Sequence, residues 1–243
     1  MACLLGRKLL SVAFIGAGMG AITGDTSIDT DYLVLYLIIG TLVWRFVGLF
    51  DNVSEMIQWE RWEGTIEYTF MAPVHRFVQM VGQTLFAIIY MLVFTAVLGV
   101  VMALFFALDL SVANLFGAMV VLLAGSLSFV SLGIVASVLP LLYTERGVQM
   151  THIVQALLLL VSGVYYPVEV LPAWLQPVAQ ISPATYVLEG MRAALLEGAD
   201  LPALTVYIVP LLAMGVVMLP LGVWLFRRGE QYAKRAGKLK RNG

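Results

Sequence analysis

The chain has 243 residues, of which 61% are hydrophobic and 12% are charged, and its mean hydropathy is +0.94. A soluble domain carries about 25% charged residues, so this composition excludes a disordered chain, a fibrous repeat and an ordinary cytosolic enzyme. The net charge is −1, and the single cysteine and two histidines argue against an internal disulfide or a histidine-built metal site. The composition therefore predicts an integral membrane protein.

Long apolar stretches dominate the chain. A helix needs about 20 mostly apolar residues to cross roughly 30 Å of hydrocarbon. We therefore predict an all-α, polytopic fold with six transmembrane helices, at residues 9–23, 32–52, 77–107, 110–142, 148–167 and 202–226. The last four stretches contain no Asp, Glu, Lys or Arg, and their length without strict alternation excludes a transmembrane barrel. The first stretch is also typical of a secretory signal peptide.

The basic residues predict the orientation. If both termini are cytoplasmic, most of the 14 basic residues fall on inner segments, including the tail at residues 227–243. The acidic loops then fall outside. We expect a single transmembrane domain over residues 1–243, located in the cytoplasmic (inner) membrane, with both termini in the cytoplasm.

The second apolar stretch, residues 32–52, places ionisable side chains within or close to the lipid. Asp51, Glu55 and Gln58 are spaced i, i+4, i+7, so they share a polar stripe that is expected to face the bundle or a partner. Arg45 lies deeper in the span. Snorkelling or a structural pair with a carboxylate is the favoured interpretation of Arg45, ahead of a substrate contact.

Small residues recur in the fourth stretch and are expected to pack helices together rather than to bind substrate. They are Gly125, Ser128, Gly133 and Ser137. The last four stretches offer His152 alone as an ionisable group, and no proton relay is visible. We find no catalytic motif and no phosphate-binding loop. The chain is therefore expected to be no enzyme, to hold no metal or cofactor, and to draw energy from another polypeptide.

Residues 55–71 are predicted to form an amphipathic cytoplasmic helix. A helix turns about 100° per residue, which places the aromatic and apolar side chains on one arc: Trp59, Trp62, Ile66 and Phe70. The adjacent arc is acidic and comprises Glu60, Glu63 and Glu67. The aromatic arc suits the headgroup boundary. Glutamates do not suit an anionic leaflet, so they indicate a positively charged protein partner. A solvated acidic face without a partner is the alternative.

Residues 168–198 precede the last stretch and are interrupted by prolines. Ser182 and Pro183 predict the start of a short helix, and Gly198 predicts its end. We expect two short helices that lie at the outer interface or re-enter the membrane there. A structural lid and an exit gate are both compatible with this pattern.

Two segments resemble one known family. The string SGVYYPVEVLPAWLQPVAQISPATYVLEGMRAALLEG, at residues 162–198, resembles the outer region of ABC type-2 transporter permeases. The string WERWEGTIEYTFMAPVHR, at residues 59–76, is similar to that family's coupling segment. The resemblance covers most of the chain from about Tyr32 onwards.

This resemblance implies the permease half of an ATP-driven exporter. The resemblance implies that the chain pairs with a second copy or a related permease, and with cytosolic ATP-binding subunits that hold ATP and Mg²⁺. It also implies contact with membrane lipid and no nucleic-acid partner. The resemblance assigns the coupling role to Glu60, Arg61, Gly64, Thr65 and Glu67, and Glu63 joins them on the acidic arc. It assigns an outer gate to Gly163, Tyr166, Pro167, Leu171, Pro172, Pro183, Tyr186 and Arg192.

Two other functions remain open. The chain could be a passive channel or an ion-coupled carrier, although its uncharged spans argue against ion coupling. It could also be a membrane scaffold or assembly factor, which would bind partners without nucleotide-dependent flux.

Overall fold

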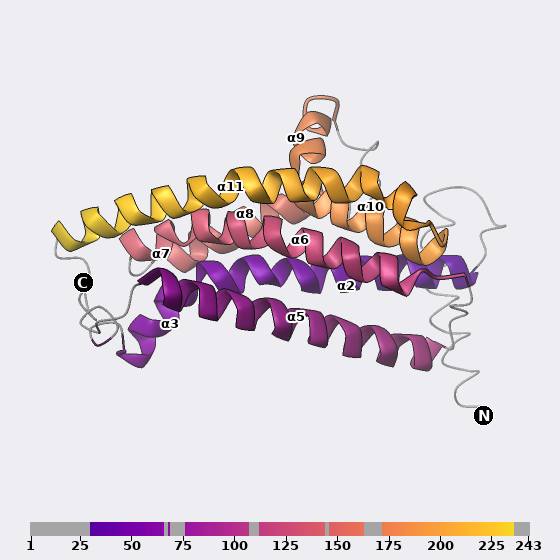
Figure 1. Cartoon of the computed structure of the whole chain (residues 1–243), viewed down its shortest axis with the longest axis horizontal. Coiled ribbons are helices and arrows are strands. Elements are labelled where there is room, and N and C mark those ends of the chain that lie inside the picture. Colours follow the sequence, from indigo (N-terminus) through magenta and orange to yellow (C-terminus); the bar gives the residue numbers. More distant parts are fainter. Residues whose placement is uncertain are drawn as a thin grey trace.

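The structure is a computed structural model of the chain, and it describes residues 30–65, 68, 76–106, 112–143, 146–162 and 172–235. These residues form helices and no strand, as the long apolar stretches predict (Figure 1). The helices are α2 (Thr30–Ser54), α3 (Met56–Glu63), α5 (Arg76–Phe106), α6 (Leu115–Ala136), α7 (Val138–Leu142), α8 (Gly147–Val161), α9 (Gln176–Ile181), α10 (Pro183–Leu196) and α11 (Leu201–Arg235). The all-α fold class is confirmed for the described residues.

Four segments are long and apolar enough to cross a membrane. They are Leu35–Ser54, Val78–Phe105, Leu115–Leu142 and Leu201–Arg235. These segments correspond to the second, third, fourth and sixth predicted spans. The first predicted span, residues 9–23, lies outside the described residues.

The fifth predicted span is shorter than expected in the described part of the chain. Residues 148–167 were predicted to cross the membrane, but α8 has 15 residues and ends at Val161. A full crossing needs about 20. The described helices therefore account for four membrane-length segments and one shorter apolar helix.

The helix α6 lies at the centre of the bundle and packs against α2, α10 and α11. Its glycines permit close approach, because a Cβ added at Gly125 would lie 2.5 Å from Val187 of α10 and one at Gly133 would lie 2.8 Å from Val53 of α2. The Ser128 hydroxyl donates to the Leu211 carbonyl of α11. The predicted packing role of the small residues in this span is confirmed.

The predicted span at residues 110–142 contains two helices, α6 and α7, which are separated at Ser137. The Ser137 amide donates to the Gly133 carbonyl and closes the last turn of α6. Pro140 then follows within α7, and proline has no amide hydrogen to continue the helical bonding. The missing amide hydrogen of Pro140 therefore accounts for the break between α6 and α7.

The helices α8 and α10 occupy opposite halves of the bundle. Figure 1 shows α8 near the end that holds α7, α10 near the opposite end, and α9 projecting sideways between them. Helix α10 is largely buried and packs against α2, α6 and α11. It begins at Pro183, as predicted, and Gly198 follows it with φ +63°. Within the predicted outer segment 168–198, α10 is thus a core element of the bundle.

Candidate functional site

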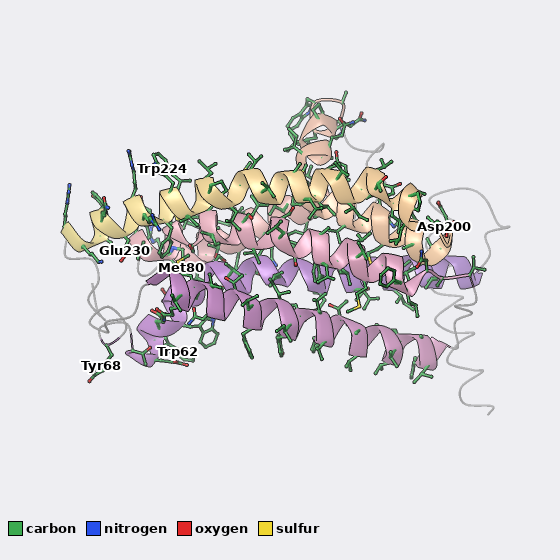
Figure 2. The ribbon with its side chains drawn as sticks, viewed as in Figure 1. Trp62, Tyr68, Met80, Asp200, Trp224 and Glu230 are labelled. Atoms are coloured by element: carbon green, nitrogen blue, oxygen red, sulfur yellow. The ribbon has the colours of Figure 1, made fainter. Side chains whose placement is uncertain are left out.

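The helix α3 forms a short foot at one end of the bundle (Figure 1), where it packs against α2 and α7. It follows α2 almost directly, because the amide of Glu55 donates to the Asp51 carbonyl and the amide of Trp59 donates to the Glu55 carbonyl. Figure 2 places Trp62 at the same end as Glu230 of α11, and Asp200 at the other end. The foot therefore follows α2 directly, at the end of the bundle that also holds α7 and the C-terminal turns of α11.

A glycine cap ends α3 earlier than predicted. Residues 55–71 were expected to form one helix, but α3 ends at Glu63, and Gly64 has φ +74°. The Thr65 amide donates to the Glu60 carbonyl at 2.9 Å, which is the long hydrogen bond of a Schellman cap. A left-handed residue cannot continue an α-helix, so Gly64 and Thr65 form the turn that ends the foot.

The aromatic arc of α3 is exposed, as predicted for its described members. Trp59 is 51% exposed and Trp62 is 74% exposed, and their rings meet edge to face at 5.3 Å between centroids. Ile66 and Phe70, the other members of the arc, lie outside the described residues. The two indoles therefore present an exposed, partly apolar surface.

The acidic arc is only partly exposed, which corrects the prediction for Glu60. Glu60 is 6% exposed and accepts a hydrogen bond from the side-chain amide of Gln79 in α5. It shares a face with the buried Met56 at i, i+4, and this face packs against the bundle. Glu63, the last residue of α3, is exposed.

Two predicted coupling residues have no described side chain. Arg61 lies within α3, but its side chain falls outside the description, as does the whole of Glu67. Of the predicted coupling set, the structure thus places Glu60 inside, Glu63 outside, and Gly64 and Thr65 in the cap.

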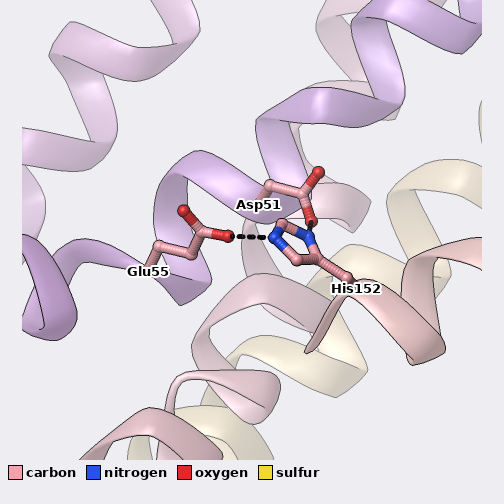
Figure 3. Close-up of side chains that lie close together, drawn as sticks. All are labelled: Asp51, Glu55 and His152. Atoms are coloured by element: carbon pink, nitrogen blue, oxygen red, sulfur yellow. Dashed lines mark ion pairs between the residues drawn. The ribbon is translucent and has the colours of Figure 1, made fainter. Parts of the chain in front are cut away.

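A cluster of ionisable side chains joins α2 to α8 beside the foot (Figure 3). His152 Nε2 lies 3.2 Å from Glu55 Oε1, and His152 Nδ1 lies 3.8 Å from Asp51 Oδ1. The polar stripe predicted for Asp51 and Glu55 therefore faces the bundle. The side chain of His152 is 54% exposed, whereas those of Asp51 and Glu55 are 20% and 17% exposed.

The cluster places one imidazole between two carboxylates. Burial raises the pKa of Glu55, and the neighbouring His152 opposes the rise. A proton on His152 would place one positive charge between two carboxylates. The three ligand atoms lie within 4.8 Å of one another, so the same side chains could hold a divalent transition-metal ion after a small closure. A protonated His152 or a bound metal ion would each hold α8 against the end of α2.

The sequence shows His152 as an ionisable side chain but does not pair it with the polar stripe of Asp51 and Glu55. The residue lies about one turn into α8, and its partners come from a helix that precedes it by almost 100 residues. The available signal was that His152 is the one ionisable side chain in an otherwise uncharged stretch.

Arg45 contacts an aromatic ring of the neighbouring helix. Its guanidinium carbon lies 4.8 Å from the centre of the Phe94 ring of α5, and the residue is half-buried. This cation–π contact joins α2 to α5. The sequence favours snorkelling or a structural pair with a carboxylate for Arg45, and the contact found in the structure is with an aromatic ring.

The structure describes four of the eight predicted outer gate residues, three of them in α10 and one before α9. Pro183 is buried at the start of α10, Tyr186 is half-buried, and the Arg192 guanidinium lies 3.7 Å from the centre of the Tyr36 ring of α2. Pro172 is exposed before α9. Gly163, Tyr166, Pro167 and Leu171 lie outside the described residues.

Comparison with protein-family profiles identifies a family for this chain. A sequence profile described as ABC-2 type transporter matches residues 5–196, which is most of the chain. No curated protein matches the chain significantly. The matched range includes the foot, the His152 cluster and α10.

Proposed function

Because the chain belongs to the ABC-2 type transporter family and is a multi-pass membrane protein, we propose that it is the permease subunit of an exporter driven by ATP hydrolysis in a separate cytosolic subunit. The working unit would contain a second copy of this chain or a related permease. ATP and Mg²⁺ would be bound by the cytosolic subunits. The family match carries the permease assignment, and the foot formed by α3 carries the proposal for how it is driven.

The foot suits a docking element because it is exposed on one side and anchored on the other. Glu63, Trp59 and Trp62 are exposed, so a partner with basic and apolar groups could bind them. Glu60 faces inward and is bonded to Gln79 of α5. A force on the foot would therefore reach α5 through Glu60 and α2 through the continuous backbone.

The His152 cluster extends this connection to a third helix. Glu55 stands at the junction of α2 and α3 and contacts His152 of α8. Movement of the foot would then be transmitted to α2, α5 and α8 together. We propose this mechanical link as the route from the ATP-binding subunits to the translocation path.

Charge distribution supports a cytoplasmic location for the foot. The last turns of α11 carry Arg227, Arg228, Lys234 and Arg235, and they lie at the same end of the bundle as α3 (Figure 2). Basic residues favour the cytoplasmic side. We propose that this end and both termini face the cytoplasm, in the inner membrane.

The test is co-purification followed by transport. The full chain is purified from its host in mild detergent, and a soluble ATPase is expected at a stoichiometric amount. Glu63→Lys is expected to weaken that association by reversing the exposed charge. Glu197→Lys, which reverses an exposed charge just before α11 at the opposite end, is the matched control and should leave the association unchanged.

Other outcomes would identify the alternative functions. Transport by this chain alone in liposomes without ATP would indicate a channel or carrier and would overturn the proposal. Stable partner binding without nucleotide-dependent flux would indicate a scaffold.

A further inference from the structure

A pocket of about 420 Å³ lies between α2, α5, α6 and α10, in the half of the bundle away from the foot. Its walls are almost entirely hydrocarbon and include Ile38 and Leu42 of α2, Leu122 of α6 and Met191 of α10. The pocket is separate from the His152 cluster and from α3. Side chains fill most of the space between helices in a bundle, so we expect an apolar pocket of this size to hold a ligand.

One polar side chain interrupts the apolar wall. Thr95 of α5 lines the pocket, is 3% exposed, and has a hydroxyl without a hydrogen-bond partner in the described part of the chain. Threonines in helices usually bond back to a carbonyl one turn earlier, as Thr41 does to Leu37 at 2.9 Å. A buried hydroxyl left unpaired is unfavourable. Thr95 therefore offers one hydrogen bond to whatever fills the pocket.

The volume and the lining define the ligand class. An apolar cavity of about 150 Å³ holds a benzene molecule, so 420 Å³ has room for roughly 15 to 20 non-hydrogen atoms. We propose that this pocket binds a single-chain amphiphile from the membrane, with its alkyl chain against the apolar wall and one oxygen hydrogen-bonded to the Thr95 hydroxyl. Small-molecule sites commonly combine an apolar wall with a few placed polar groups.

A substitution at Gly99 can test whether the pocket binds a ligand, because a larger side chain there would fill it. Gly99 lines the pocket one turn after Thr95, and a Cβ added there would lie 3.7 Å from Leu42, which is ordinary contact. A phenylalanine at this position would occupy the pocket. Gly82 lies on the same helix, and a Cβ there would meet nothing within 4 Å. Gly99→Phe and Gly82→Phe therefore add the same ring inside and outside the pocket.

The experiment is photolabelling of the full chain in phosphatidylcholine nanodiscs. The probes are hexadecan-1-ol and hexadecane, each carrying a diazirine, and labelled peptides are identified by mass spectrometry. For the wild type, we expect the alcohol to label pocket-lining peptides of α5 and α6, with unlabelled hexadecan-1-ol competing. Gly99→Phe should abolish this labelling, and Gly82→Phe should preserve it.

The hydroxyl is tested by an isosteric change. Thr95→Val should weaken competition by the alcohol by roughly three- to tenfold, the equivalent of one hydrogen bond, and leave labelling by hexadecane unchanged. Thr95→Ser retains the hydroxyl and should retain the preference for the alcohol. Thr41→Val alters a hydroxyl outside the pocket and serves as the control.

Several results would overturn the proposal. They are labelling spread evenly over the apolar surface of the wild type, equal effects of Gly99→Phe and Gly82→Phe, or an unchanged alcohol preference in Thr95→Val. Size-exclusion profiles and melting temperatures identify misfolded variants, and Thr95→Val keeps the test valid if Gly99→Phe fails to fold. The assay needs no ATP-binding subunit, so its failure is distinguishable from failure of the export proposal.

Discussion

The Nε2 atom of His152 lies 3.2 Å from the Oε1 atom of Glu55, and this contact joins the start of α8 to the junction between α2 and α3. Asp51, one turn earlier, approaches the other nitrogen of the same imidazole. A displacement of the foot must either carry α8 with it or break this contact. The contact is therefore the most direct place to test whether α3 and α8 move together.

A double-mutant cycle should detect the coupling between these residues. We expect His152→Gln and Glu55→Gln together to show an interaction energy of about 0.5–1 kcal/mol, the range of partly exposed ion pairs. Thermal unfolding of each variant in detergent near pH 6 measures it. Glu197→Gln changes an exposed carboxyl just before α11, at the opposite end of the bundle, and should show no coupling to His152→Gln; equal coupling for both carboxyls would contradict the assignment.

The stability of the protein should depend on the ionisation of Glu55. Burial raises the pKa of this carboxyl above its ordinary value of 4.5. A group whose pKa is higher in the folded state than in the unfolded state loses its stabilising contribution as the pH rises through the folded pKa. As the pH rises above 4.5, the wild type should therefore lose stability relative to Glu55→Gln.

Melting temperatures of the wild type and Glu55→Gln between pH 4 and pH 8 check this prediction. Glu63→Gln is the control, because Glu63 is exposed at the end of α3, and its curve should run parallel to that of the wild type. Parallel curves for Glu55→Gln as well would refute the role of Glu55 burial.

The bond between Glu60 and Gln79 should hold the foot against α5. Gln79→Ala removes a donor from the buried Glu60 and should destabilise the fold by about 1–3 kcal/mol. Limited proteolysis should then cut more rapidly near α3. Gln83→Ala, one turn further along α5, alters a half-buried amide of the same type and should leave the proteolysis rate near α3 unchanged. Unaltered cleavage in Gln79→Ala would show that α3 is anchored in another way.

The approach of α2 to α6 should depend on the absence of a side chain at Gly133. A Cβ there would lie 2.8 Å from Val53 and 3.0 Å from the Phe50 carbonyl oxygen. Because backbone atoms cannot yield as a flexible side chain can, Gly133→Ala should destabilise the bundle by about 1–3 kcal/mol. Gly82→Ala, in open space on α5, should be neutral or slightly stabilising. Equal melting temperatures for the two variants would count against this packing.

Several features were accessible from local sequence alone. Apolar stretches of membrane length predict α2, α5, the α6–α7 span and α11, because lipid requires every backbone group to be bonded within its own helix. The pair Ser182 and Pro183 predicts the start of α10 through the fixed φ of proline. Gly64 is also recognisable as a position where a helix can end, because glycine adopts the left-handed conformation of a helix cap. The predicted helix nevertheless extends to residue 71.

Other features depended on how helices face one another. Periodicity places Glu60 and Glu63 on neighbouring arcs of one helix, but it does not state which arc meets the bundle. Packing of α3 against α2 and α7 decided that Glu60 is buried and Glu63 is exposed. Arg45 met an aromatic ring for the same reason, since its partner belongs to α5.

The sequence by itself determined that this chain is a helical membrane protein with an amphipathic foot, because hydrophobicity and helix signals act over a few turns. Tertiary structure alone brought His152 to Asp51 and Glu55, and enclosed the Thr95 hydroxyl among four helices. Each of these sites joins residues that are distant along the chain. Their meeting depends on the rotation and offset of whole helices, which are set by the combined packing of many small and large side chains.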